Sequence, residues 1–311
     1  DRDAVDIFFL HPAGRVSEVQ RRQMTTVLAP NVHNIAIKGN FDDCQDLVKG
    51  LFTNAEFRQK HQLSAANSIN WARIMAQIVY YFSTALELGA PDRRLVFSVP
   101  TGNFGNVYAG YAARRMGLPI ERLIIGSNAN DILTRYFETG FMQAAPVVPT
   151  TSPSMDIQVS SNFERLLFEH CRRDGRTVAR LMNKFRAKGE VSFGQVRWRT
   201  MRKIFSGYRL GDNATGEVIK DIHSKTGVLL DPHSAIGVEA GRQGHEGSDV
   251  ALISLATAHP VKFPEAVEQA SGMAPALPAR LAGLMERLER FDTLPNDLAG
   301  LLVFISERLA P

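Results

Sequence analysis

Residues 95–128 constrain the fold more than any other part of the 311-residue sequence. The apolar run at 95–99 is typical of a buried parallel strand, and a glycine-rich turn, Gly102-Asn103-Phe104-Gly105-Asn106, follows it. Helical periodicity over 107–116 and a second apolar run at 123–126 predict a helix and another strand. A strand, a glycine-rich turn and a helix in this order present free backbone N–H groups and a positive helix end to a phosphate.

The turn does not match the common nucleotide-binding motifs. It lacks the Gly-Lys-Ser/Thr ending of a P-loop, and its glycines do not have the G-x-G-x-x-G spacing. The sequence therefore argues against a nucleoside triphosphate or a dinucleotide as the ligand. The alternative is an ordinary turn whose glycines supply positive φ angles. The flanking Pro100-Thr101 and the paired asparagines favour the phosphate site.

The segment PTGNFGN, followed by AGY and MGLPI, resembles the cofactor-phosphate loop of the threonine synthase family, pyridoxal-phosphate (PLP) enzymes of the tryptophan synthase β-like group. Further segments resemble the same family, in the same order and over nearly the whole chain: LHPAGRVSEVQRRQMTT, GNFDDCQDLVK, NSINWARI, SNANDILTRYFETG, SSNFERLLF, LDPHSAIGVEAG and LATAHPVKFPEAV. The resemblance implies PLP fold type II. This is an α/β fold with two open, twisted, mainly parallel sheets flanked by helices, together with a helical insertion.

The alternation of strand and helix patterns predicts parallel pairing with right-handed crossovers. The Gly-Ala-Pro-Asp turn at 89–92 is the expected domain boundary. Residues 1–90 would be the remainder of a small N-terminal α/β domain. Residues 91–311 would form a large PLP-binding α/β domain with a mainly helical insertion at about 142–228. Amphipathic helices are predicted for 278–291 and 296–309.

The resemblance also implies how the cofactor is bound. The backbone N–H groups of the turn would hold the PLP phosphate, and the hydroxyl of Thr257 would hydrogen-bond the pyridine nitrogen. The residues of that turn are Gly102, Asn103, Phe104, Gly105 and Asn106. Without the resemblance, the sequence favours a cap or turn hydroxyl for Thr257.

The segment NSINWAR carries the predicted substrate site. By resemblance, Asn67, Ser68 and Arg73 receive the phosphate of O-phospho-L-homoserine, and an arginine fork suits a phosphate. The alternative is a simple helix cap at Asn67 or Ser68 beside a surface arginine. His233 and His259 are interpreted as structural, and no His/Cys/Asp spacing matches a metal site.

The lysine that holds PLP as a Schiff base lies in a Phe-Lys-Asp segment in this family. None of the nine lysines follows a Phe and precedes an Asp, and the family's Ser-Gly-Asp-Thr-Gly loop is also absent. The sequence opens at Asp1, directly in a strand pattern and without a start methionine. We therefore expect a threonine synthase that lacks its N-terminal part, with the catalytic lysine upstream of Asp1. We expect these 311 residues to be inactive alone.

The implied reaction converts O-phospho-L-homoserine and water to L-threonine and phosphate, with PLP as cofactor. Two alternatives remain open. One is another PLP enzyme of the same fold, such as threonine dehydratase or cysteine synthase, whose substrates have no γ-phosphate for NSINWAR to bind. The other is a non-catalytic relative that binds small phosphorylated ligands.

Composition favours a cytoplasmic enzyme. The chain is 44% hydrophobic, enough for a substantial core, and no apolar run approaches the ~20 residues of a membrane helix. Its two cysteines are far apart in sequence, which fits a reducing compartment. The net charge is +4, and basic residues cluster over 165–209, but apolar residues at helical spacing there favour a solvated helix face over nucleic-acid binding. We expect a monomer or homodimer with no nucleic-acid or membrane partner.

Overall fold

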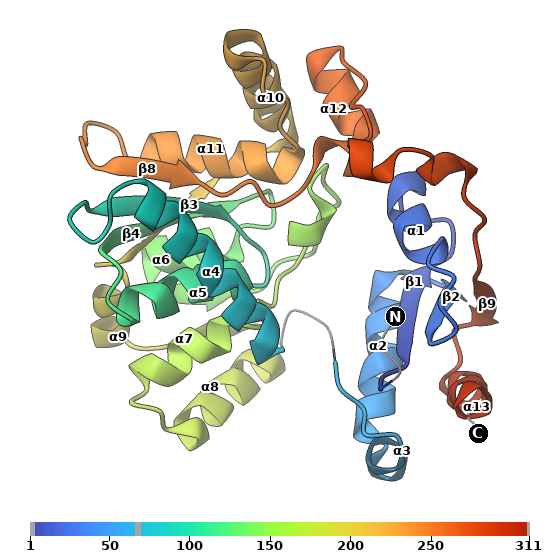
Figure 1. Ribbon diagram of the computed structural model, residues 1–311. Helices are drawn as coiled ribbons and strands as arrows, with labels where there is room; N and C mark the ends of the chain where they lie inside the picture. The colour runs from blue at the N-terminus through green and yellow to red at the C-terminus, as the bar shows by residue number, and fades with distance from the viewer. Residues whose placement is uncertain (1–3, 66–69, 310–311) are drawn as a thin grey trace. The chain divides into compact units, whose positions relative to one another are not determined.

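The computed structural model describes residues 4–65 and 70–309 (Figure 1). The chain forms two compact units. The first comprises Asp1–Ser64 and Ala276–Pro311, and the second comprises Ala65–Pro275. This division differs from the expected one at residues 90 and 91. The long helix α4 (Trp71–Glu87) packs into the core of the second unit, and the last strand, β9 (Asp292–Pro295), returns to pair with β2 (Val32–Lys38) of the first.

The first unit is a three-stranded parallel sheet with helices around it. Its strand order is β1-β2-β9, in which β1 spans Ile7–Pro12. Its helices are α1 (Glu18–Thr25), α2 (Phe41–Thr53), α3 (Ala55–Lys60) and α13 (Leu298–Arg308). Asn40 caps helix α2 in a capping box with Asp43 whose hydrogen bonds are 2.7 and 2.9 Å long.

The second unit contains a four-stranded parallel sheet of order β7-β4-β3-β8. The strands are β3 (Leu95–Pro100), β4 (Ile120–Ser127), β7 (Phe205–Arg209) and β8 (Ala251–Ser254). Phe97 belongs to the core that includes α4 and α5 (Gly105–Arg115), whereas Val96 packs with Ala240 of α11 (Pro232–Gly244). Helices therefore cover both faces of the sheet (Figure 1), and all six residues of β3 are buried.

The region at about 142–228, expected to be a mainly helical insertion, contains four α-helices and two strands. It contains α7 (Phe163–His170), α8 (Gly175–Lys188), α9 (Gln195–Met201) and α10 (Asp212–Thr226). It also contributes β7 to the main sheet and β6 (Glu190–Ser192), which pairs antiparallel with β5 (Phe141–Gln143). Helices α6 (Ile132–Thr139) and α12 (Pro264–Ser271) complete the unit.

The helix predicted for 278–291 is not formed. Two 3₁₀ turns, Ala279–Leu281 and Leu284–Glu286, occupy this region, and the unpredicted strand β9 follows them. Gly283 between the turns has φ +71°, which interrupts a right-handed helix. Beyond the turns, the Glu289 carboxylate accepts hydrogen bonds from Arg21 of α1 at 2.8 and 2.9 Å. This tertiary contact outweighs the local helical pattern.

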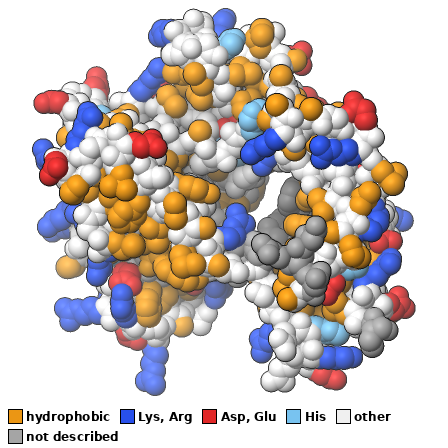
Figure 2. Space-filling view, viewed as in Figure 1, with side chains coloured by type: hydrophobic (Ala, Val, Ile, Leu, Met, Phe, Trp, Pro, Cys, Tyr) orange, Lys and Arg blue, Asp and Glu red, His pale blue; other side chains and the backbone are white. Residues whose placement is uncertain are grey.

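Helix α4 is apolar on two faces. Ile74, Ile78, Tyr81 and Ala85 are buried against the sheet. Exposed apolar side chains of the same helix, including those of Trp71, Met75, Val79, Tyr80 and Leu86, contribute to the hydrophobic surface seen over α4 in Figure 2. No helix within the described ranges has the length and apolar character needed to cross a membrane.

Candidate functional site

The predicted phosphate-binding turn lies at the carboxyl end of β3. Phe104 has φ +61° and directly precedes α5, whose N-terminus receives no side-chain cap. The N–H groups of residues 102–106 donate no hydrogen bond to any other described residue. The turn therefore places several free donors at the positive end of an 11-residue helix. We call residues 102–106 the cradle.

The cradle leaves little space for a side chain at its first residue. A Cβ atom on Gly102 would lie 3.0 Å from the Cα of Met155 and 3.1 Å from the carbonyl oxygen of Ser154. These are backbone atoms, so they cannot move aside as a flexible side chain would. Glycine at this position lets the loop that contains Ser154 and Met155 close against the turn.

A polar network at the end of β4 holds that loop. The side-chain amide of Asn128 donates to Thr150, Ser152 and Asp156, at 2.8, 2.9 and 2.7 Å to the side-chain oxygens. Asn130 donates to the same Asp156 oxygen at 2.9 Å. In the sequence, the SNAND segment indicated only the family resemblance. Asparagines placed directly after a buried strand are the signal that could have revealed its role.

Helix α4 supports the other end of the cradle. Tyr81 is fully buried and its hydroxyl donates to the backbone oxygen of Asn106 at 2.7 Å. Burial raises the pKa of Tyr81 well above its ordinary value, so the hydroxyl remains a donor. The side-chain oxygen of Asn106 is buried and has no hydrogen-bond partner among the described residues. A bound ligand could therefore satisfy it.

Thr257 follows the carboxyl end of β8, which is paired with β3. Ser98 lies opposite Ser254, and the N–H of Leu255 donates to Ser98 at 3.0 Å. The cradle and Thr257 therefore follow the ends of two adjacent parallel strands, the edge at which open α/β sheets bind ligands. Thr257 is exposed, and no described residue hydrogen-bonds its hydroxyl.

The first turn of α11 holds the backbone of Thr257. The Thr257 N–H donates to the Ser234 hydroxyl at 3.2 Å, and that hydroxyl in turn contacts the Asp231 carboxylate at short range. Asp231 caps α11 and also binds the backbone N–H and the Nδ1 of His233, both at 2.9 Å. The expected structural role of His233 agrees with this geometry, although its Nε2 is buried without a partner in the described part of the chain.

The predicted substrate-phosphate residues are only partly visible. Asn67 and Ser68 lie outside the described residues. Arg73 lies in the first turn of α4 and is exposed. The side chain of Asn70, rather than Asn67 or Ser68, caps this helix by accepting from the N–H of Ala72 at 2.9 Å. The role of Arg73 stays a prediction.

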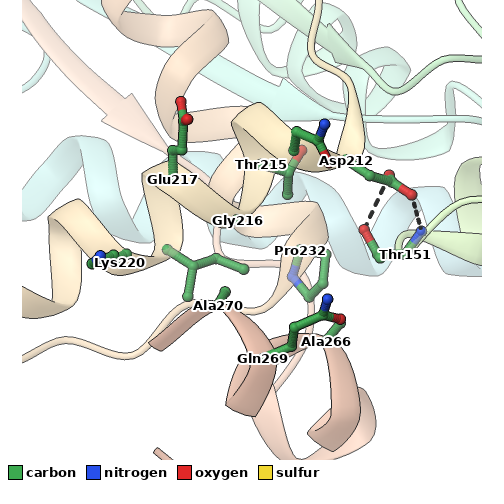
Figure 3. A pocket seen from close by; sticks show the side chains of 12 residues that line it. Thr151, Asp212, Thr215, Gly216, Glu217, Lys220, Pro232, Ala266, Gln269 and Ala270 are labelled. Carbon is green, nitrogen blue, oxygen red and sulfur yellow. Dashed lines mark hydrogen bonds between the residues drawn. The ribbon is translucent and has the colours of Figure 1, made fainter. Parts of the chain in front are cut away.

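A pocket with a volume of about 440 Å³ lies elsewhere in the second unit, between α10 and α12 (Figure 3). Neither a cradle residue nor Thr257 lines it. Its Asp212 carboxylate accepts hydrogen bonds from the N–H and hydroxyl of Thr151, both at 3.1 Å. No group of three or more metal-ligating side chains occurs among the residues that the structure describes.

Comparison with known proteins gives one consistent result. The family model described as threonine synthase, C-terminal, matches residues 234–305, a range that includes Thr257. Threonine synthase of Pseudomonas aeruginosa is 56% identical over 306 residues, covering 98% of this chain and 65% of that protein. Threonine synthase of Corynebacterium glutamicum is 41% identical, covering 99% of this chain and 66% of the relative. The chain thus spans slightly less than two thirds of these relatives' length.

Solved structures agree with the sequence comparison. The structure of PLP-bound threonine synthase from Brucella melitensis superimposes with a TM-score of 0.94 at 52% identity, covering all of this chain and 67% of that one. The yeast threonine synthase structure gives a TM-score of 0.90 at 37% identity, covering 99% of this chain and 65% of that one. These matches confirm the predicted α/β fold class.

Proposed function

The chain belongs to the threonine synthase family, and from that membership we propose that its protein converts O-phospho-L-homoserine and water to L-threonine and phosphate with PLP as cofactor. The observation that carries the proposal is that the cradle and Thr257 follow the carboxyl ends of two paired strands, β3 and β8, at one edge of the sheet. Free N–H donors at a helix N-terminus suit the phosphate of PLP, and an exposed hydroxyl on the neighbouring strand end suits the ring.

When bound, PLP supplies an electron sink that allows protons to leave carbons next to the amino group of the substrate. The residues of this chain would bind and orient the cofactor and the substrate. The cradle would hold the phosphate of PLP, and the Thr257 hydroxyl would hydrogen-bond the pyridine nitrogen. Because a hydroxyl is neutral, it would leave that nitrogen unprotonated and make the sink milder than a carboxylate would.

Arg73, with Asn67 and Ser68, would hold the γ-phosphate of the substrate. This assignment favours threonine synthase over threonine dehydratase or cysteine synthase, whose substrates carry no such group. None of the nine lysines has the Phe-Lys-Asp context of the family, so we propose that the catalytic lysine is supplied by sequence outside these 311 residues. We also propose a cytoplasmic enzyme, consistent with two buried cysteines that are both free.

The test is product analysis with the complete protein. O-phospho-L-homoserine should yield threonine and phosphate in equal amounts, whereas O-phosphothreonine and serine should yield little product. Turnover of threonine or serine to an oxo acid, with none of phosphohomoserine, would identify a dehydratase instead. PLP binding without turnover of any of these substrates would favour the non-catalytic alternative. Borohydride trapping of PLP on one lysine of these 311 residues would overturn the placement of the catalytic lysine.

A further inference from the structure

A short segment directly before α7 forms hydrogen bonds with the cradle. We propose that Ser160, Ser161 and Asn162, here called the clamp, position the phosphate-binding N–H groups by holding the carbonyl groups of the cradle on the opposite side. The inference rests on the proposed function, because it takes the phosphate of PLP to be the ligand of these N–H groups.

Four hydrogen bonds join the clamp to the cradle. The Ser160 hydroxyl donates to the backbone oxygen of Gly102 at 2.7 Å. The backbone N–H and the side-chain amide of Asn162 both donate to the backbone oxygen of Asn103, each at 3.0 Å. The Ser161 hydroxyl donates to the side-chain oxygen of Asn103 at 3.2 Å. Two consecutive cradle carbonyls are thus bound by the same segment.

Because each peptide group is planar, binding its carbonyl oxygen also fixes the direction of its N–H group. In a planar trans peptide the C=O and N–H bonds point in opposite directions. Holding the oxygen of Gly102 therefore aims the N–H of Asn103 away from the clamp, and holding the oxygen of Asn103 does the same for Phe104. Neither N–H donates to a described residue, so both remain free for a ligand on the far side.

The clamp is itself rigidly placed. Ser160 is 7% exposed and Asn162 is 1% exposed. Arg165 donates to the side-chain oxygen of Asn162 at 3.0 Å, which leaves the amide nitrogen facing Asn103. The ring of Phe163, the next residue, meets the ring of Phe104 edge to face with centroids 5.5 Å apart. This contact steadies the one cradle residue in the left-handed region.

The experiment compares two ligands that differ only in the phosphate. Affinities for PLP and for pyridoxal, which lacks the phosphate, are measured in the complete protein for wild type, Asn162→Ala and Ser160→Ala. Asn162→Ala removes one bond directly and loosens a second, so PLP affinity should fall about tenfold while pyridoxal affinity changes less than about threefold. Ser160→Ala should lower PLP affinity by about threefold with the same selectivity.

Asn34→Ala provides the matched control. Asn34 is also buried and its amide also donates to a backbone oxygen, that of Met24 at 3.0 Å, but it lies in the first unit. This variant should leave the ratio of the two affinities unchanged even if it lowers the thermal midpoint. If Asn162→Ala does not fold, Ser160→Ala carries the test alone.

The outcomes separate the inference from the proposed function. Wild-type protein that binds PLP no more tightly than pyridoxal would overturn the phosphate site itself. Wild-type protein that prefers PLP, with variants that lose both ligands equally or neither, would overturn only the clamp.

Discussion

Replacing Gly102 by alanine tests whether the cradle is built to exclude a side chain. The added methyl group would lie 3.0 Å from the Cα of Met155, 3.1 Å from the oxygen of Ser154 and 3.2 Å from the Cδ1 of Ile157. Two of these three contacts are to backbone atoms. The loop that provides them is pinned through Asp156, which accepts from the side-chain amide of Asn128 at 2.7 Å, so it cannot retreat without breaking that network.

The expected loss of stability in Gly102→Ala follows from overpacking in a region whose backbone is held in place. Such substitutions destabilise proteins by about 1–3 kcal/mol. For a unit of this size, each kcal/mol lowers the thermal midpoint by about 2–4 °C. Because the turn must shift to relieve the contact, Gly102→Ala should also weaken PLP binding by about tenfold, equivalent to ~1.4 kcal/mol.

The assay is thermal unfolding of the complete protein, together with PLP titration. Gly216→Ala is the control, since Gly216 lies within α10 and its added methyl group would meet only the Cβ of Ala270 at 3.7 Å, an ordinary contact. That variant should keep PLP affinity and should be as stable as wild type or more stable by up to ~1 kcal/mol. A Gly102→Ala protein with wild-type midpoint and PLP affinity would refute the argument.

Three further predictions concern other residues. Arg73→Lys in the complete protein should raise KM for phosphohomoserine and lower kcat/KM by at least about tenfold; an equal loss of PLP affinity would contradict the assignment. Thr257→Val should lower PLP affinity by ~1–3 kcal/mol while Thr257→Ser retains it, as measured by titration and absorbance spectra. The hydrogen bond from Arg21 lowers the pKa of Glu289 to about 2 from its ordinary 4.5, so its stabilisation is complete above pH 4.5 and is lost as the pH falls toward 2. Glu289→Gln should flatten the decline of the thermal midpoint between those pH values, and an unchanged decline would show that other groups cause it.

The sequence predicted the central elements well because their signals are local. The apolar run at 95–99 matches β3, and the glycine-rich turn matches the start of α5. Residues whose structure depends on distant contacts were not predictable in this way. Pairing of β9 with β2 joins segments more than 250 residues apart, and Glu289 binds Arg21 across a similar separation. A helical pattern read over 278–291 contains no information about either contact.

The same limit explains why the support around the cradle was missed. Asn162 meets Asn103 across 59 residues, and Asn128 meets Asp156 across 28. Each is a polar residue near the start of a helix or the end of a strand, a position that many asparagines occupy for local reasons. Only the fold shows that both segments support the same turn. The turn and both supporting segments belong to the second unit.

The role of Thr257 was open between a turn hydroxyl and a partner of the cofactor ring. A turn or cap hydroxyl would bond a nearby backbone group, and no such bond from Thr257 occurs within the described ranges. In the same loop that task falls to His259, whose Nδ1 accepts from the N–H of Val261 at 3.2 Å. The backbone of Thr257 is meanwhile held by Ser234, so its side chain is presented at the sheet edge without being needed by the loop. Because the loop does not use the Thr257 hydroxyl, a ligand-facing role for this hydroxyl is favoured. Thr257→Val keeps the shape of the side chain but removes the hydroxyl, so it should affect PLP binding far more than folding.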